Sequence, residues 1–171
     1  AHKDGEIATT KAAKNLNTIM SHSTISNKSI KEVGPIHDKT FFQLYFSKDR
    51  DFTSQMLKEC KSLGYKGIVF TVDAPRLGTR ERDERNSFKM PDNLKLGNFI
   101  GTKFERFDKI EEYDGSSMKV HSDHLFDPSL TFDIIPWIKE QSSLPVLVKG
   151  ILRPDDATQA LSYGADGIII S

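Results

Sequence analysis

The sequence predicts a parallel α/β fold, in which short buried strands alternate with helices. Three apolar runs, residues 67–72, 144–148 and 167–170, carry Val and Ile at successive positions. Such runs are typical of strands that are covered on both faces. Segments with helical spacing lie between the apolar runs, as in folds built from β-α-β units. The 171 residues suffice for one domain with a sizeable core.

Charge, cysteine content and hydropathy exclude several classes of function. The 24 Lys and Arg residues balance 24 Asp and Glu residues, so no global basic field points to nucleic acid as a partner. The single cysteine cannot form an internal disulfide, which fits a reducing compartment. No apolar stretch approaches the roughly 20 residues that cross a bilayer. The chain also has neither a phosphate-binding Gly-rich loop nor a nucleophile elbow.

The first elements each have their own local signal. An Ala-rich segment without Gly or Pro predicts a helix over residues 6–15, and residues 18–21 are the first expected strand. Ser29 and Glu32 have the spacing of a capping box, which predicts a short helix after them. The apolar run 41–46 is the second expected strand.

A longer helix is expected before the third strand, which covers residues 67–72. Gly64 is its expected stop. Its apolar residues recur at near-helical intervals, and they are Phe52, Met56, Leu57, Cys60 and Leu63. Cys60 is therefore interpreted as a core residue rather than a reactive thiol.

Two further helices precede the last two strands. Thr131 is the expected cap of a helix that runs to about Gln141, with a kink or a later start at Pro136. Pro154 opens the next helix. Its apolar face is expected to hold Ala157, Ala160 and Leu161, with Gly164 beyond its end.

Residues 86–128 are polar and poorly periodic, so we expect an irregular loop that is either a lid or disordered. His121 and His124 lie within it and are interpreted as loop residues rather than metal ligands. The charged run 80–85 is typical of a solvated helical face.

Polar residues recur where the buried strands end. Because parallel α/β proteins bind ligands beyond the carboxyl ends of their strands, this recurrence favours a site over mere loop boundaries. The residues are Ser21 and Ser23, Gln43 and Tyr45, Thr71 and Asp73, Lys149, and Ser171. Three alternatives stay open: Asp73 caps a turn, Lys149 leaves the sheet for solvent, or Tyr45 is a core tyrosine.

Three linked motifs resemble the family of FMN-dependent 2-hydroxy-acid oxidases and dehydrogenases. They are FFQLY at 41–45 followed by KDR at 48–50, TVDAPRLG at 71–78 with Arg80, and LPVLVKG at 144–150. Residues 2–6, 127–130 and 164–171 agree with the family in order and spacing, so the resemblance covers essentially the whole chain. Within the family, the motifs resemble those of the glycolate oxidase branch. The family usually has Pro where Lys3 stands and Ser where Thr24 stands.

The resemblance implies a (β/α)₈ TIM barrel that holds FMN at the carboxyl ends of its strands. Residues 1–171 would be the central part of this domain, an incomplete barrel with about five strands. The residues that would contact the flavin are Ser23, Gln43, Thr71, Lys149 and Ser171. Lys149 would lie near the flavin N1 side, where a fixed cation stabilises the negative charge of reduction.

The resemblance also implies the roles of the substrate-facing residues. Tyr45 would hydrogen-bond the substrate, Arg80 would meet its carboxylate, and Asp73 would orient a histidine base. In the family, that histidine and a second arginine follow the serine matched by Ser171. We therefore expect the chain to lack turnover when it is isolated.

The implied activity is oxidation of (S)-2-hydroxy acids to 2-oxo acids, with oxygen as acceptor and hydrogen peroxide as product. One alternative is an L-lactate dehydrogenase of the same family that passes electrons to a cytochrome or quinone, and another is a truncated fragment without catalysis. The resemblance further implies a homotetramer at full length and an intracellular location. Peroxisomes are favoured over the cytoplasm or mitochondria.

Overall fold

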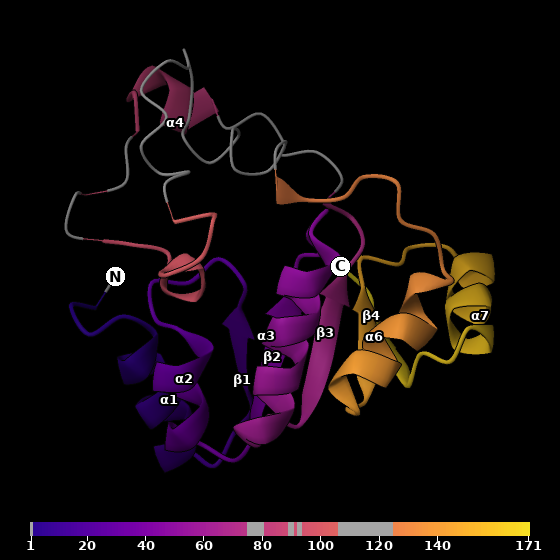
Figure 1. The fold of residues 1–171 in the computed structure, drawn as a ribbon, viewed down its shortest axis with the longest axis horizontal. Helices are drawn as coiled ribbons and strands as arrows, with labels where there is room; N and C mark the ends of the chain where they lie inside the picture. Colours follow the sequence, from indigo (N-terminus) through magenta and orange to yellow (C-terminus); the bar gives the residue numbers. More distant parts are fainter. Residues whose placement is uncertain (1, 75–80, 89–90, 92–93, 106–124) are drawn as a thin grey trace.

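The structure is a computed structural model that describes residues 2–74, 81–88, 91, 94–105 and 125–171. Its centre is a five-stranded sheet in which the strands lie in chain order and every neighbouring pair is parallel (Figure 1). The elements are α1 (Glu6–Asn15), β1 (Met20–Ser23), α2 (Ile30–Val33), η1 (Gly34–Ile36), β2 (Thr40–Leu44), α3 (Arg50–Ser62), β3 (Gly67–Thr71), α4 (Glu81–Arg85), η2 (Gly97–Phe99), α6 (Ile134–Ser142), β4 (Val146–Lys149), α7 (Pro154–Ser162) and β5 (Gly167–Ile169). The predicted parallel α/β architecture is therefore confirmed.

The core lies between the sheet and the helices that cover it. Buried and half-buried residues alternate along β2 and β4, whereas all of β3 is buried. Helices α3 and α6 pack side by side over the strands (Figure 1). The buried cluster includes Phe42, Leu44, Met56, Leu57, Cys60, Ile68, Ile135, Ile138, Val146 and Val148. The half-buried strand residues, among them Gln43 and Lys149, therefore face the opposite side of the sheet.

The early helices form where their local signals predict. Helix α1 has the predicted bounds, and the capping box is complete: the Ser29 hydroxyl accepts from the Glu32 amide, and the Glu32 carboxylate accepts from the Ser29 amide. In α3, the Asp49 carboxylate accepts from the Phe52 amide at 3.0 Å. The predicted stop, Gly64, follows the helix with φ +82°, a left-handed conformation that suits glycine.

The prediction that Thr131 caps a helix is wrong. Helix α6 begins at Ile134 with Asp133 as its N-cap residue, and the Thr131 hydroxyl donates to the Asp133 carboxylate instead. The later start places Pro136 in the first turn, where the amide that proline lacks would have no intrahelical partner.

Two expectations about burial are also wrong. The residues of β5 are only half-buried and Ile170 is 81% exposed, because β5 pairs with β4 alone within the described sheet. Leu161 is 49% exposed although Ala160 of the same helix is fully buried. Helix α7 lies at the edge of the sheet (Figure 1), so only a narrow stripe of it meets the core.

The segment 86–128 is only partly described. Its described part contains η2, in which the Phe99 ring stacks on Phe52 of α3 with 5.4 Å between centroids. Leu125 is buried as well. The lid itself stays a prediction, whereas α4 is a solvated helix without buried residues, as the charge pattern of residues 81–85 predicts.

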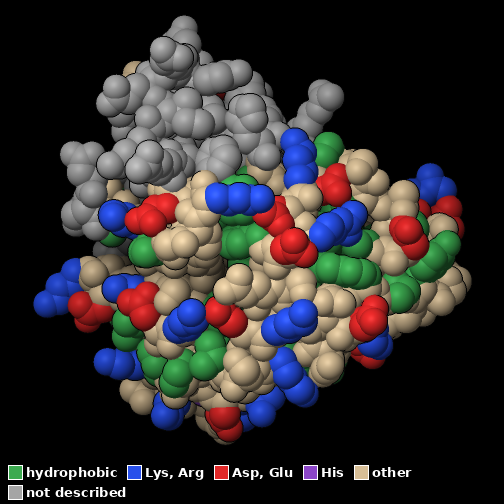
Figure 2. Space-filling view, in the orientation of Figure 1, with side chains coloured by type: hydrophobic (Ala, Val, Ile, Leu, Met, Phe, Trp, Pro, Cys, Tyr) green, Lys and Arg blue, Asp and Glu red, His purple; other side chains and the backbone are tan. Residues whose placement is uncertain are grey.

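Acidic and basic side chains are intermixed on the face shown in Figure 2, so neither sign forms a continuous field there. Among the described helices, none is long and apolar enough to cross a membrane.

Candidate functional site

Three of the predicted flavin-contacting residues form one hydrogen-bonded chain across the carboxyl ends of β1, β2 and β3. The Ser23 hydroxyl donates to Gln43 Oε1 at 2.8 Å, and Gln43 Nε2 donates to Thr71 Oγ1 at 2.9 Å. The parallel register places Ser23 opposite Gln43, which brings the first pair together. Thr71 follows Val69, the register partner of Gln43, by two residues and so projects to the same side.

This chain fixes the orientation of the Gln43 amide and leaves part of it available. Each side of the amide has one described partner, so a second N–H and a second lone pair remain for a ligand. The Thr71 hydroxyl accepts from Gln43 and keeps its own hydrogen to donate. Adjacent donors and acceptors of this kind match the polar edge of a planar heterocycle.

Lys149 ends β4 and lies opposite Thr71 in the register. It is half-buried, and no hydrogen bond or ion pair joins its ammonium to any residue that the structure describes. A half-buried cation with no described hydrogen bond or ion pair is suited to a ligand that carries or acquires negative charge. Ser171 differs, because it is exposed and lies two residues beyond the end of β5. The structure therefore does not join Ser171 to the chain of Ser23, Gln43 and Thr71.

Asp73 is held close to the backbone that follows Lys149. Gly150 has φ +106°, and a Cβ atom there would lie 2.6 Å from Cγ and 2.7 Å from Cβ of Asp73. Only a residue without a side chain lets the strand end and Asp73 approach this closely. Asp73 is itself exposed and follows the end of β3 by two residues. Sequence reasoning assigned no role to Gly150, although a glycine directly after a strand-terminal lysine is a signal for a close backbone approach.

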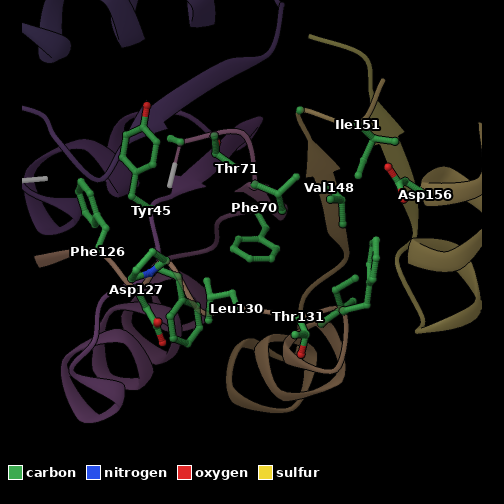
Figure 3. Close-up of a pocket in the computed structure, with 17 residues that line it drawn as sticks. Tyr45, Phe70, Thr71, Phe126, Asp127, Leu130, Thr131, Val148, Ile151 and Asp156 are labelled. Carbon is green, nitrogen blue, oxygen red and sulfur yellow. The ribbon is translucent and has the colours of Figure 1, made fainter. Parts of the chain in front are cut away.

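Tyr45 directly follows β2 and is half-buried beside a cavity of about 390 Å³ (Figure 3). Its ring packs against Phe126, with 5.0 Å between the centroids. Phe126 reaches the site through a bridge to Ser47, a long-range contact that gives no local sequence signal. The cavity is lined by Tyr45, Phe46, Phe70, Thr71, Val72, Ala74, Phe126, Asp127, Pro128, Leu130, Thr131, Phe132, Ile135, Val148, Gly150, Ile151 and Asp156.

Asp127 places a negative charge at the cavity wall. Burial acts to raise the pKa of the Asp127 carboxyl, but hydrogen bonds from Ser129 and the charges of Arg50 and Lys48 outweigh it, so the pKa is lower than usual. The Asp127 carboxylate lies 3.5 Å from the Arg50 guanidinium. The Asp127 carboxyl is therefore ionised at neutral pH.

Two predicted groups lie outside the described residues, namely Arg80 and the pair His121 and His124. Within the ranges that the structure describes, no cluster of three or more His, Cys, Asp or Glu residues could hold a metal ion.

A family-wide sequence match covers residues 1–171 and identifies the FMN-dependent dehydrogenases. The chain belongs to this family. It is 41% identical over 173 residues to 2-hydroxyacid oxidase 1 of Mus musculus, which matches 100% of this chain and 47% of that protein. Glycolate oxidase 3 of Arabidopsis thaliana is 42% identical over 174 residues, again 100% of this chain and 46% of the relative.

Solved structures agree with these relatives. The crystal structure of mandelate oxidase with (S)-4-hydroxymandelic acid aligns with a TM-score of 0.84 and 30% identity, over 98% of this chain and 46% of that chain. The five-stranded sheet is thus part of a (β/α)₈ barrel, and the predicted family, fold and FMN cofactor are confirmed. The chain spans about half the length of the curated relatives it matches.

Proposed function

We propose that these residues form part of an enzyme that oxidises (S)-2-hydroxy acids to 2-oxo acids, with oxygen as acceptor and hydrogen peroxide as product. The observation that carries the proposal is the hydrogen-bonded chain of Ser23, Gln43 and Thr71 beside Lys149, whose ammonium has no partner among the described residues. Together these residues offer fixed hydrogen-bond donors, an acceptor and a cation at the carboxyl ends of the strands. Three relatives whose names describe oxidases of 2-hydroxy acids support the substrate class.

The donors and acceptors at this edge would hold the FMN ring. Gln43 would hydrogen-bond the polar edge of the ring, with Ser23 and Thr71 fixing its amide. Bound FMN supplies a two-electron acceptor for the substrate. Lys149 would stabilise the negative charge that the ring gains on reduction, because a preorganised cation in a partly dry site needs little reorganisation.

The substrate would lie between the ring and the residues beyond the strand ends. Tyr45 would donate a hydrogen bond to the substrate carboxylate or hydroxyl, and Arg80 would bind the carboxylate. Asp73, which lies against Gly150, would orient the family's histidine base and stabilise its imidazolium once it takes the substrate proton. Loss of two electrons and two protons gives the 2-oxo acid, and the same electrons and protons convert oxygen to hydrogen peroxide. That product is the reason to propose a peroxisomal location.

The proposal is tested on the full-length enzyme by oxygen consumption and by flavin bleaching with glycolate, L-lactate and longer 2-hydroxy acids. Bleaching together with oxygen uptake is the expected result. Bleaching that needs a cytochrome or quinone for reoxidation would assign the protein to the dehydrogenases instead. If no 2-hydroxy acid bleaches the flavin, the proposed function is wrong.

The Lys149→Met variant tests the role assigned to the lysine. We expect flavin reduction to slow at least about 100-fold, equivalent to about 2.7 kcal/mol of lost charge stabilisation. The measurement is stopped-flow absorbance of the bound flavin under anaerobic conditions. Lys58→Met is the matched control, because Lys58 is exposed on α3, and it should keep the wild-type rate. Equal rates in the two variants would return Lys149 to a solvent-facing role.

A further inference from the structure

A fully buried histidine directly precedes Ser23 on β1. His22 is 0% exposed and projects to the helix-covered side of the sheet, opposite to Ser23. Its Nδ1 lies 2.9 Å from the Tyr65 hydroxyl. Its Nε2 lies 2.7 Å from Ser26 Oγ and 2.9 Å from the Lys28 carbonyl oxygen. Tyr65 and Ser26 are each 2% exposed, so the whole cluster is shielded from water.

The partners of His22 determine which ring nitrogen carries the proton. The Lys28 carbonyl can only accept, and the Ser26 hydroxyl donates its hydrogen to the same carbonyl at 2.7 Å. The hydrogen of a neutral imidazole must therefore lie on Nε2, shared between these two acceptors. Nδ1 is then an acceptor, and the Tyr65 hydroxyl donates to it. Neutral His22 satisfies every partner, whereas the second proton of an imidazolium would require the Tyr65 hydroxyl to rotate and accept instead of donating.

His22 thereby ties the strand to the turn that follows it, and two other elements hold the same turn. The Glu6 carboxylate of α1 accepts from the amides of Asn27 and Lys28, at 3.3 and 3.1 Å. The Asn98 amide of η2 donates to the Ser23 and Thr24 carbonyls, at 3.3 and 3.0 Å. The imidazole anchors the turn from the helix-covered side of the sheet.

The conformation of this turn determines the position of Ser23, the first of the predicted flavin contacts, and of the backbone before Tyr45. The Ser23 hydroxyl accepts from the Ile25 amide at 3.1 Å while it donates to Gln43 Oε1. The Thr24 hydroxyl donates to the Gln43 carbonyl at 2.8 Å and accepts from the Tyr45 amide at 3.0 Å. A displaced turn would therefore move the Ser23 hydroxyl away from the Gln43 amide and loosen the backbone before Tyr45.

We propose that His22 is a positioning residue of the flavin site, whose neutral imidazole holds the 23–30 turn so that Ser23 orients the Gln43 amide toward FMN. The inference rests on the proposed function, because it takes Ser23 and Gln43 as flavin contacts. It predicts that flavin affinity depends on the protonation state of a residue that does not touch the flavin.

The charges around His22 set the pH range. Burial lowers the pKa of His22 from its usual 6.5, against opposing contributions from the Lys28 carbonyl and from the carboxylates of Glu6 and Glu32. The Lys28 ammonium lies 3.4 Å from the Glu32 carboxylate, which offsets part of that negative charge. Burial raises the pKa values of Tyr65 and of the nearby Cys60 thiol, so both remain protonated. The contribution of His22 to flavin affinity should therefore be constant above pH 6.5 and be lost as the pH decreases through the lowered pKa.

The experiment compares FMN dissociation constants by quenching of flavin fluorescence between pH 5 and 8. His22→Gln keeps a donor near the Nε2 position and does not titrate, whereas His22→Leu removes donor and acceptor together. At pH 7.5 we expect His22→Leu to weaken FMN binding about tenfold, the equivalent of about 1.4 kcal/mol for a lost buried hydrogen bond. The FMN dissociation constant of His22→Gln should stay within about threefold of the wild-type value and lose its acid dependence. The FMN phosphate titrates equally in all variants, so differences between them isolate His22.

A third variant, Tyr65→Phe, gives a prediction with a sign. Without the tyrosine hydroxyl, the imidazolium loses the only described group that could accept its Nδ1 proton, so the pKa of His22 falls further and the acid weakening of FMN binding moves to lower pH. Imidazole nitrogen NMR shifts should show the Nε2–H tautomer at pH 7.5. The neutral Nδ1–H tautomer at pH 7.5 would overturn the inference. So would a His22→Gln variant that binds FMN as weakly as His22→Leu and keeps the acid dependence. If His22→Leu binds FMN as tightly as wild type, only the role proposed for His22 is wrong. If the wild-type protein does not bind FMN, both that role and the proposed function are wrong.

Discussion

Single residues at the carboxyl edge are constrained by backbone space as much as by chemistry. Gly150 combines φ +106° with an Asp73 side chain that occupies the space of a Cβ atom. Gly64 also has a positive φ, +82°, but a Cβ atom there would meet no atom within 4 Å. Substitutions at the two glycines therefore allow the cost of a left-handed backbone to be separated from the cost of steric overlap.

At the residue scale, we predict that Gly150→Ala destabilises the protein about 2 kcal/mol more than Gly64→Ala. The control should cost about 1 kcal/mol for the left-handed backbone alone, and the additional loss comes from overlap with Asp73. Free energies of unfolding from urea titration give the comparison. Equal losses in both variants would mean that Asp73 moves aside freely and is not held by the strand end.

The short helix α2 shows how an element of marginal length is stabilised at its start. Ser29 and Glu32 exchange hydrogen bonds, and Ile30 and Val33 pack into the core. The backbone amide of Ser29 is the main cause that lowers the pKa of Glu32 below 4.5. Because the folded pKa is lowered, the contribution of Glu32 is complete above pH 4.5 and is lost as the pH falls through the lower value.

At the element scale, Ser29→Ala should reduce the free energy of unfolding by about 1 kcal/mol, because it removes the side chain that caps the helix. Ser62→Ala, at the exposed end of α3, is the matched control and should change stability by less than about 0.5 kcal/mol. Thermal unfolding at pH 7 provides the measurement. Similar melting temperatures for the two variants would show that packing alone holds α2.

The whole molecule, as described, is an open parallel sheet with one neighbour for each outer strand. β5 pairs only with β4 within the described sheet, and Ile170 beside it is 81% exposed. Unpaired strand edges and apolar side chains next to them promote association between copies. Residues 1–171 studied alone should therefore associate with increasing concentration.

At the scale of the molecule, Ile170→Lys should reduce this association, because a charge beside the edge opposes pairing with a second strand. Analytical ultracentrifugation over a concentration series measures the effect. Leu16→Lys is the control, since Leu16 is 78% exposed after α1 and lies outside the sheet. Equal association in both variants would place the contact elsewhere than at the β5 edge.

Much of the fold follows from local signals that act over a few residues. Helix α1, the capping box of α2 and the stop at Gly64 formed as predicted, because caps, glycines and helical spacing operate within one or two turns. Thr131 does not cap α6, because the helix begins three residues later, at Ile134, with Asp133 as its N-cap residue. Leu161 failed as a core residue because burial depends on where α7 meets the sheet, which helical spacing cannot specify.

The sequence by itself determined the order of strands and helices, the polar residues at the strand ends, and the family whose motifs they match. The tertiary structure decided how those residues meet. The Gln43 amide is oriented by partners 20 and 28 positions away, and His22 meets Tyr65 across 43 positions. Such contacts depend on strand register and on what packs above the sheet, so they exist only after the chain has folded.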